Sequence, residues 1–220
     1  MCYAEKIRSY YTSMTNERRG IMKKQIALVM ATMMTVAAVA PMAYAEAETE
    51  AMPGDTMETA IAFDYHDIDE DVYDGAWVST GLGFDMYLPS DWVLTEISDE
   101  EAEAGLVFRA GEDGGGANVC ITCTEIPEEV ADTYDYDAMK AEYDAAATTA
   151  MFLDLNGIPA IGFDNDEAKV SGFSILPGDG TVITGVIAPP SDEEYEDFAP
   201  YFQNMMMSVS PTEEAETEAE

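Results

Sequence analysis

Apolar and polar positions alternate most clearly after residue 150, where they predict four strands. Four apolar runs are separated by short polar or glycine-containing segments: residues 151–155, 158–163, 168–175 and 181–188. Asn156-Gly157 joins the first two runs, and these two residues tolerate the positive φ that a type I′ turn requires at both central positions. We therefore expect a four-stranded antiparallel meander in this region.

A helical period follows the meander and predicts one amphipathic helix from Ser191 to about Val209. Its apolar stripe comprises Tyr195, Phe198, Ala199, Phe202, Met206 and Val209. Ser191 and Glu194 have the spacing of a capping box, in which each side chain bonds a free backbone N–H of the first turn. The period places Pro200 and Asn204 on the polar side, so we expect a kink at Pro200, and it points Met207 away from the core.

The same two patterns occur more weakly in the preceding residues. Strands are expected at residues 77–80, 83–88, 106–110 and 118–124. A short helix is expected after Ser98, which has capping-box spacing to Glu101, and a longer one over residues 135–147. Together with the meander, these elements predict a single α+β domain over residues 61–210, an antiparallel β-sheet flanked by helices.

Three short motifs resemble the PsbP/Mog1-like domains. Phe84-x-x-x-Leu88-Pro89-x-x-Trp92 is similar to the opening of that family, Leu155-Asn-Gly-Ile-Pro159 to its mid-domain hairpin, and Met206-Met-Ser-Val209 to the end of its closing helix. The resemblance implies an αβα sandwich with an antiparallel sheet. It implies no enzymatic activity, since these domains mostly bind other proteins or have no assigned role, and it carries over no functional residue.

The N-terminal residues have the pattern of a bacterial secretory signal. Residues 1–21 show no apolar period, and we expect Met22 to be the true start. The basic Met22-Lys23-Lys24 precedes an apolar run at residues 26–40, and Ala43-Tyr44-Ala45 matches a cleavage site. The sequence thus predicts a signal peptide at residues 22–45, no transmembrane segment in the mature chain, and secretion to the extracellular space.

Acidic residues dominate the expected mature chain. After residue 45, three basic residues accompany 43 acidic ones, a formal charge of −40 compared with −36 for the whole chain. We expect residues 46–60 and 211–220 to form a disordered leader and tail, because both are acidic and poor in large apolar residues. The charge argues against nucleic acid and anionic membranes as partners and favours a soluble monomer. Cations and basic or neutral partners remain open.

Residues suited to catalysis or metal binding are sparse. His66 is the only histidine and lies in the acidic entry segment, so the core has no base for a Ser-His-Asp or Cys-His arrangement. Cys120 and Cys123 have redox or zinc spacing, yet in a strand they point to opposite faces, and we expect two unpaired thiols. No cofactor is expected.

One acidic run has part of a calcium-loop pattern. Asp67, Asp69 and Asp71 match the first three ligand positions of an EF-hand. Val72 then replaces the required glycine, and Val78 occupies the position of the bidentate glutamate. We therefore interpret this run as solvated and expect no metal site.

These patterns favour a secreted, non-catalytic binding module of the bacterial cell exterior with an unknown protein or cell-surface ligand. The alternative is a small acid-dependent hydrolase or a cation-binding protein, and two carboxyl groups converging in an apolar pocket with raised pKa values would favour the enzyme. Tyr87, Tyr134 and Tyr201 are the candidate binding residues, because each is predicted on a face of its element that is not the core face.

Overall fold

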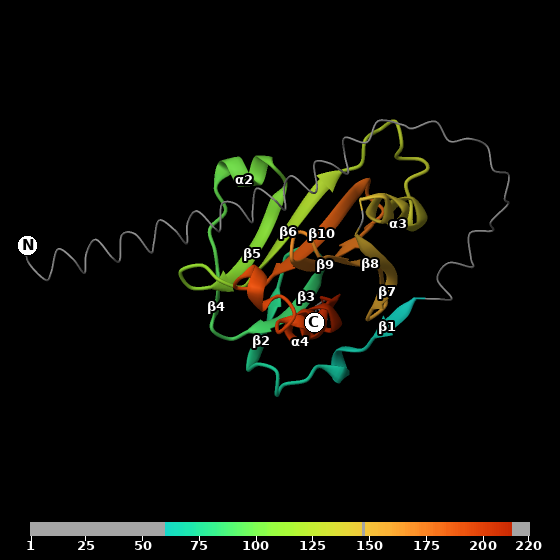
Figure 1. Ribbon diagram of the computed structural model, residues 1–220. Helices are drawn as coiled ribbons and strands as arrows, with labels where there is room; N and C mark the ends of the chain where they lie inside the picture. Colours follow the sequence, from blue (N-terminus) through green and yellow to red (C-terminus); the bar gives the residue numbers. More distant parts are fainter. Residues whose placement is uncertain (1–59, 147, 213–220) are drawn as a thin grey trace, which may run out of the picture.

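The computed structural model describes residues 60–146 and 148–212, and Figure 1 shows how their elements are arranged. The predicted N-terminal extension and signal peptide, residues 46–59 of the leader and residues 213–220 of the tail lie outside the described residues. No helix in the described part of the chain has the length and apolar character needed to cross a membrane.

Two β-sheets form the body of the domain. The larger sheet has eight strands in the order β1 (Ile61–Phe63), β7 (Thr149–Leu155), β8 (Ile158–Asn165), β9 (Val170–Ile175), β10 (Thr181–Ala188), β6 (Asn118–Glu125), β5 (Leu106–Glu112) and β4 (Trp92–Leu94). The smaller sheet has the order β11 (Ser210–Pro211), β3 (Phe84–Pro89) and β2 (Gly75–Ser79). Neighbouring strands are antiparallel except for β1 and β7, which pair in parallel.

Helices cover both faces of the larger sheet. They are α2 (Asp99–Glu103), α3 (Tyr136–Ala145) and α4 (Ala199–Ser208), with two 3₁₀ turns, η2 (Tyr65–Asp67) and η3 (Asp192–Glu194). The main core lies between the two sheets and α4 and contains Phe84, Phe173 and Phe202. A smaller cluster on the other face includes Phe163, which stacks on Tyr143 of α3. The predicted α+β class, an antiparallel sheet flanked by helices, is confirmed.

The predicted meander is confirmed as β7–β10, with hairpin pairing between successive strands. Asn156 and Gly157 have φ values of 54° and 88°, as the turn requires. The turn also contacts α4, because the Asn156 side-chain amide donates hydrogen bonds to the carbonyl oxygens of Met207 at 2.8 Å and Val209 at 2.7 Å. These two carbonyls would otherwise have no partner beyond the helix end.

The single helix predicted from Ser191 to Val209 is wrong in its first half. The segment forms η3 and a turn, and α4 begins around Pro200, which occupies its first turn. Proline lacks a backbone N–H, and the first helical turn is the place where that N–H would have no partner. The Ser191 hydroxyl bonds the Glu194 carboxylate at 2.8 Å and no backbone N–H, so the predicted capping box does not form.

The predicted polar side of this helix is also partly wrong, because α4 is buried on a second side. Asn204 is 3% exposed and Met207 is 7% exposed. The Asn204 side chain donates to the Asp69 carbonyl oxygen at 2.7 Å and accepts from the Asp69 N–H at 3.1 Å. The segment after η2 therefore covers a face of α4 that the helical period assigned to solvent.

Two short strands extend the sheets beyond the predicted elements. β1 adds an edge to the larger sheet, whereas the sequence predicted the first strand at residues 77–80, within β2. Pro211 pairs with Phe84 in β11, and the Thr212 N–H donates to the Gly83 carbonyl oxygen at 3.0 Å. Pro211 and Thr212, which were expected to begin the tail, are thus held by the smaller sheet.

Candidate binding cleft

A cleft of about 510 Å³ opens between the β4 edge of the larger sheet, the smaller sheet and the segment that leads into α4. Pockets of this size can take a small ligand or the side chains of a peptide. Its lining residues come from distant parts of the sequence: Tyr73, Asp74, Pro89, Ser90, Asp91, Trp92, Glu112, Pro190, Glu194, Asp197, Phe198 and Tyr201.

The floor of the cleft is set by strand pairing and by one turn. Trp92 of β4 lies directly opposite Glu112 of β5 in the antiparallel register. Ser90, in the turn between β3 and β4, donates its N–H to the Asp74 carbonyl oxygen at 2.9 Å and its hydroxyl to the Asp74 carboxylate at 3.0 Å. These bonds continue the pairing of β2 and β3 by one residue and fix the start of the turn that carries Asp91.

Stacked aromatic rings form one wall. Tyr201 of α4 stacks on Phe198 with a centroid distance of 4.6 Å and on Tyr73 with a distance of 5.2 Å. The Tyr73 hydroxyl donates to the Tyr87 carbonyl oxygen at 2.9 Å. Burial raises the pKa of Tyr73, so this phenol stays neutral. The rings are fixed by one another before any ligand arrives.

Trp92 differs from the stacked rings because its indole is unused. It is half-buried against the core. Among the described residues, no ring contact or side-chain hydrogen bond involves it. Indole carries an N–H donor, and its π-face attracts cations more strongly than phenyl or phenol rings do. Trp92 therefore brings to the cleft lining one N–H donor and one π-system that have no hydrogen-bond or ring partner in the described part of the chain.

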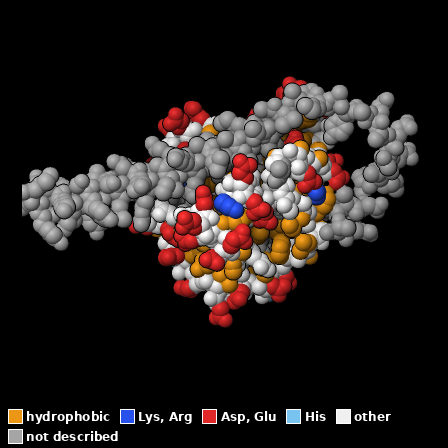
Figure 2. All heavy atoms as spheres, viewed as in Figure 1, with side chains coloured by type: hydrophobic (Ala, Val, Ile, Leu, Met, Phe, Trp, Pro, Cys, Tyr) orange, Lys and Arg blue, Asp and Glu red, His pale blue; other side chains and the backbone are white. Residues whose placement is uncertain are grey.

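Carboxylates line the cleft, and none of the described residues that line it is basic. They are Asp74, Asp91, Glu112, Glu194 and Asp197. Asp74 and Glu194 accept bonds from serine hydroxyls, whereas the carboxylates of the other three have no hydrogen-bond or ion-pair partner within residues 60–146 and 148–212. Figure 2 shows carboxylates spread over the visible face of the domain, with apolar atoms between them and few basic groups.

The three basic side chains in the described ranges are engaged elsewhere. Arg109 pairs with Glu101, and Lys140 pairs with Asp144, both at 2.7 Å. The Lys169 ammonium lies 5.0 Å from the centre of the Tyr195 ring. The negative charge of the cleft is therefore uncompensated by the described part of the protein.

Of the three tyrosines predicted to bind a ligand, Tyr201 alone lines the cleft. The expectation that Tyr87 faces away from the core is wrong, because it is 9% exposed and stacks behind Tyr73 at 5.6 Å. Strand β3 is covered on both faces, so alternation along it does not separate core from solvent. The Tyr87 hydroxyl accepts the Gly75 N–H at 2.9 Å.

Tyr134 lies away from the cleft, in the segment before α3. Its hydroxyl donates to the Glu142 carboxylate at 2.7 Å. Burial raises the pKa of Glu142, and the bond from Tyr134 opposes this. This is a single carboxyl group hydrogen-bonded within the fold. The pair that would favour a hydrolase, two converging carboxyl groups with raised pKa values, is not found in the part of the chain that the structure describes.

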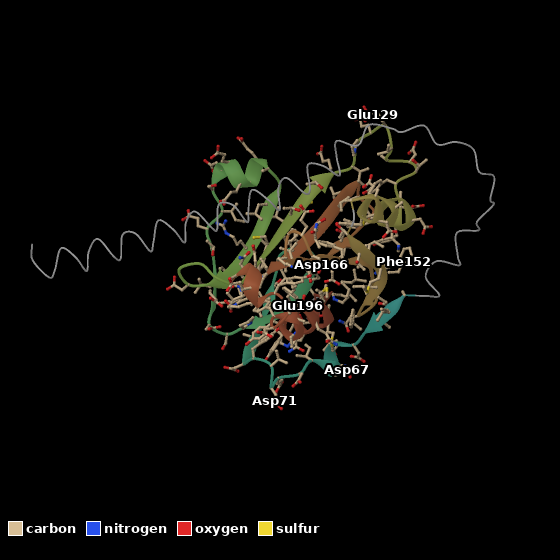
Figure 3. All side chains as sticks on the ribbon, viewed as in Figure 1. Asp67, Asp71, Glu129, Phe152, Asp166 and Glu196 are labelled. Atoms are coloured by element: carbon tan, nitrogen blue, oxygen red, sulfur yellow. The ribbon has the colours of Figure 1, made fainter. Side chains whose placement is uncertain are left out.

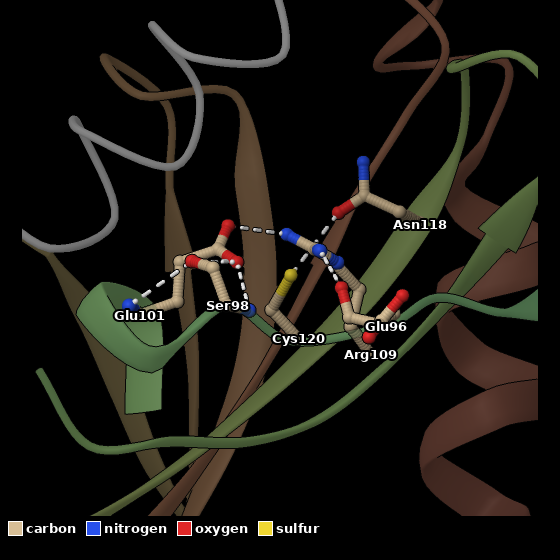
Figure 4. Close-up of polar contacts among 6 residues, drawn as sticks. All are labelled: Glu96, Ser98, Glu101, Arg109, Asn118 and Cys120. Carbon is tan, nitrogen blue, oxygen red and sulfur yellow. Dashed lines mark hydrogen bonds and ion pairs between the residues drawn. The ribbon is translucent and has the colours of Figure 1, made fainter. Parts of the chain in front are cut away.

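A second carboxylate-rich region lies at α2 and β5 (Figure 4). Arg109 donates to the Glu101 carboxylate and to the Glu96 carbonyl oxygen, both at 2.7 Å. The other Glu101 oxygen accepts the Ser98 N–H at 2.9 Å and the Ser98 hydroxyl at 2.8 Å, which confirms the predicted capping box. The bond from the Ser98 backbone is the main reason why the Glu101 pKa falls to about 2. Burial raises the pKa of the neighbouring Cys120 thiol to about 11.

The remaining sequence candidates lie apart from one another. Cys120 and Cys123 are free thiols; Cys120 is buried beside Arg109, and Cys123 packs on the main core, on the other face of the sheet. Asp67 and Asp71 project outward from the segment between β1 and β2 (Figure 3). No three His, Cys, Asp or Glu side chains within the described ranges come close enough together to hold a metal ion. His66 is exposed and bonds Asp64 at 2.7 Å.

Trp92 is a cleft residue that the sequence did not mark as a binding position, because it entered only as the last residue of the motif that begins at Phe84. The acidic residues of the cleft were visible only as part of a uniformly acidic composition. The one useful signal was the aromatic Tyr201 on the predicted outer face of α4.

Comparison with known proteins gives a likeness of fold. No protein family model matches the sequence, and no curated protein matches it. Among solved structures, the chain is similar to the solution structure of cyanobacterial PsbP (CyanoP) from Synechocystis sp. PCC 6803, with a TM-score of 0.41 and 16% sequence identity over 63% of this chain and 92% of that chain. That protein is of the PsbP type, the family that the three sequence motifs resemble. A likeness of this extent carries no information on ligand, partner or activity.

Proposed function

We propose that this protein is a secreted, non-catalytic binding module of the bacterial cell exterior and that it binds its ligand in the cleft between Trp92 and Tyr201. The observation that carries the proposal is the preformed cleft itself. The indole of Trp92, which has no hydrogen-bond or ring partner among the described residues, and the stack of Tyr73, Tyr201 and Phe198 all line its volume of about 510 Å³. Rigid aromatic groups give large contact area at low entropic cost, which is why they dominate binding sites.

The charge of the cleft supports binding of a positively charged ligand. Within the described ranges, five carboxylates line it and no basic residue does. Secretion is supported by the basic start, apolar run and Ala-x-Ala site of residues 22–45. The binding role, in preference to catalysis, is supported by Glu142 and Glu101, two carboxyl groups with shifted pKa values that are both used in hydrogen bonds within the fold.

The test compares the amount of ligand recovered from native culture medium by the immobilised wild-type protein and by variants with single aromatic substitutions. Tyr201→Ser and Trp92→Ala should lose recovery by tenfold or more. Tyr65→Ser is the matched control, because Tyr65 is 41% exposed and does not line the cleft. Tyr134→Ser, at the other predicted binding position, should also keep recovery.

Equal recovery by wild type and Tyr201→Ser would contradict the assignment of the cleft. Hydrolytic turnover by the purified protein would contradict the non-catalytic role. Intact-mass measurement of protein from the culture supernatant checks secretion, and the expected chain begins at Glu46; a chain that retains residues 1–45 would be inconsistent with the signal peptide.

A further inference from the structure

Resting on the proposed function, we infer that the cleft binds alkyl ammonium groups, that is, positively charged amines joined by methylene segments. Two sources supply this chemistry, a free polyamine and the lysine side chains of a peptide. The cleft is suited to such a ligand in charge and in polarity, and its unpaired carboxylates come from separate elements.

The carboxylates that lack partners set the charge of the ligand. The carboxylates of Asp91, Glu112 and Asp197 have no hydrogen-bond or ion-pair partner in the described part of the chain. Arg109 and Lys140 do not neutralise them, because each of these cations is paired with another acidic residue. An ammonium group has three N–H donors and no acceptor, so it complements carboxylates and cannot be replaced by an anion or a neutral acceptor.

The apolar part of the lining sets the rest of the ligand. Trp92, Phe198 and Tyr201 share the cleft with Pro89 and Pro190. Methylene stems of amines pack on apolar and aromatic surface while the charged group stays near carboxylates and water. The π-system of Trp92, which contacts no other ring among the described residues, can add a cation–π contact to an ammonium group.

The positions of the acidic groups favour several spaced charges. Asp91 lies in the turn between β3 and β4, Glu112 ends β5, and Asp197 precedes α4. They come from separate elements around the aromatic residues. A linear chain of amines can place one ammonium at each of several such points, with the methylene segments on the rings between them.

The experiment uses Trp92 fluorescence. The chain has two tryptophans, and Trp77→Phe leaves Trp92 as the only reporter; Trp77 is 47% exposed and does not line the cleft. Spermidine and a pentalysine peptide are titrated separately, with MgCl₂ at matched ionic strength as the reference. Each amine that binds should give a saturable change in Trp92 emission that MgCl₂ does not give. Calorimetry on the wild-type chain repeats the comparison without the Trp77→Phe change.

Matched double variants separate the cleft from the general acidic surface. Asp91→Asn/Asp197→Asn should weaken amine binding by about tenfold or more. Glu128→Gln/Glu129→Gln removes the same charge from the segment between β6 and α3, neither of whose two glutamates lines the cleft, and should change affinity by less than about twofold. Figure 3 labels Glu129 on this segment.

The outcomes separate this inference from the proposed function. Saturation with spermidine identifies free amines as a source, and saturation with pentalysine identifies lysine side chains. If neither amine differs from MgCl₂, or if both double variants weaken binding equally, the inference is wrong. If recovery from culture medium still depends on Tyr201 in that case, the proposed function stands and the ligand belongs to another class. If both experiments fail, the cleft is not a binding site.

Discussion

The domain has two regions where carboxylates gather, and the two treat the negative charge differently. At α2 and β5, Glu101 accepts bonds from Arg109 and from both donors of Ser98. In the cleft, Asp91, Glu112 and Asp197 lie near aromatic rings without a described cation. In the first region the carboxylate is hydrogen-bonded and ion-paired within the fold. In the second region the carboxylates are available to water or to a ligand.

This difference shows how function can be sought in a chain whose composition is acidic throughout. The number of carboxylates has no value as a signal, because 43 of them follow residue 45. What distinguishes a position is whether the fold itself supplies a partner. A carboxylate with a partner inside the protein is expected to stabilise the fold. A carboxylate that has no such partner and lies next to aromatic rings is expected to destabilise the fold slightly while it is available to bind a ligand.

The largest effect on stability is expected from removing the cation of the internally paired region. Arg109→Met leaves the Glu101 carboxylate, whose side chain is 22% exposed, without its cation and should lower the free energy of unfolding by about 2–3 kcal/mol. Lys140→Met is the control, because it removes an exposed i, i+4 pair and should cost less than about 0.5 kcal/mol. Urea denaturation measures both. Equal losses would erase the distinction between the two kinds of pair.

An intermediate effect on stability is expected from removing the Glu101 carboxylate, and this effect should depend on pH. Because the folded pKa of Glu101 is about 2, below the ordinary value of 4.5, this carboxylate stabilises the fold fully above pH 4.5. That contribution declines as pH falls from 4.5 toward 2. Glu101→Gln should therefore be less stable than wild type near neutral pH, and the difference should shrink over this range. Thermal unfolding at pH 6, 4, 3 and 2.5 measures it, and two curves that stay parallel would speak against the assignment.

The smallest expected effect concerns the cleft. The triple variant Asp91→Asn, Glu112→Gln, Asp197→Asn should be as stable as wild type or more stable, by up to about 1 kcal/mol at low salt, because it relieves repulsion among unpaired charges. The gain should diminish with added NaCl, since the screening length falls to about 10 Å at 0.1 M. Denaturation midpoints at low and moderate salt measure it. A loss above about 1 kcal/mol would mean that these acids have a structural role like that of Glu101.

Local patterns predicted the elements whose signals lie in neighbouring residues. The meander, the Asn156-Gly157 turn and the Ser98–Glu101 cap depend on neighbouring residues, and all three form. Predictions failed where tertiary packing buries a second face, as at Tyr87 in β3 and Asn204 in α4. The alternation of apolar residues in a strand and their period in a helix indicate which face packs on the core. They do not indicate whether another segment of the chain covers the opposite face.

The cleft could not be predicted for a related reason. Its residues come from four separate parts of the chain, at residues 73–74, 89–92, 112 and 190–201. Tyr201 was identified because it lies on an outer helix face. Trp92 and Glu112 meet only because β4 and β5 pair in that register, which the spacing of residues along the sequence does not determine.

The two hydrogen bonds from Asn156 also bear on the order in which the domain opens. They join the turn of β7 and β8 to the last carbonyls of α4, across 51 and 53 residues of sequence. The end of α4 can therefore not loosen without releasing the hairpin turn. In hydrogen-exchange experiments, the amides at the end of α4 and those around the turn should exchange with a common opening free energy, as one cooperative unit.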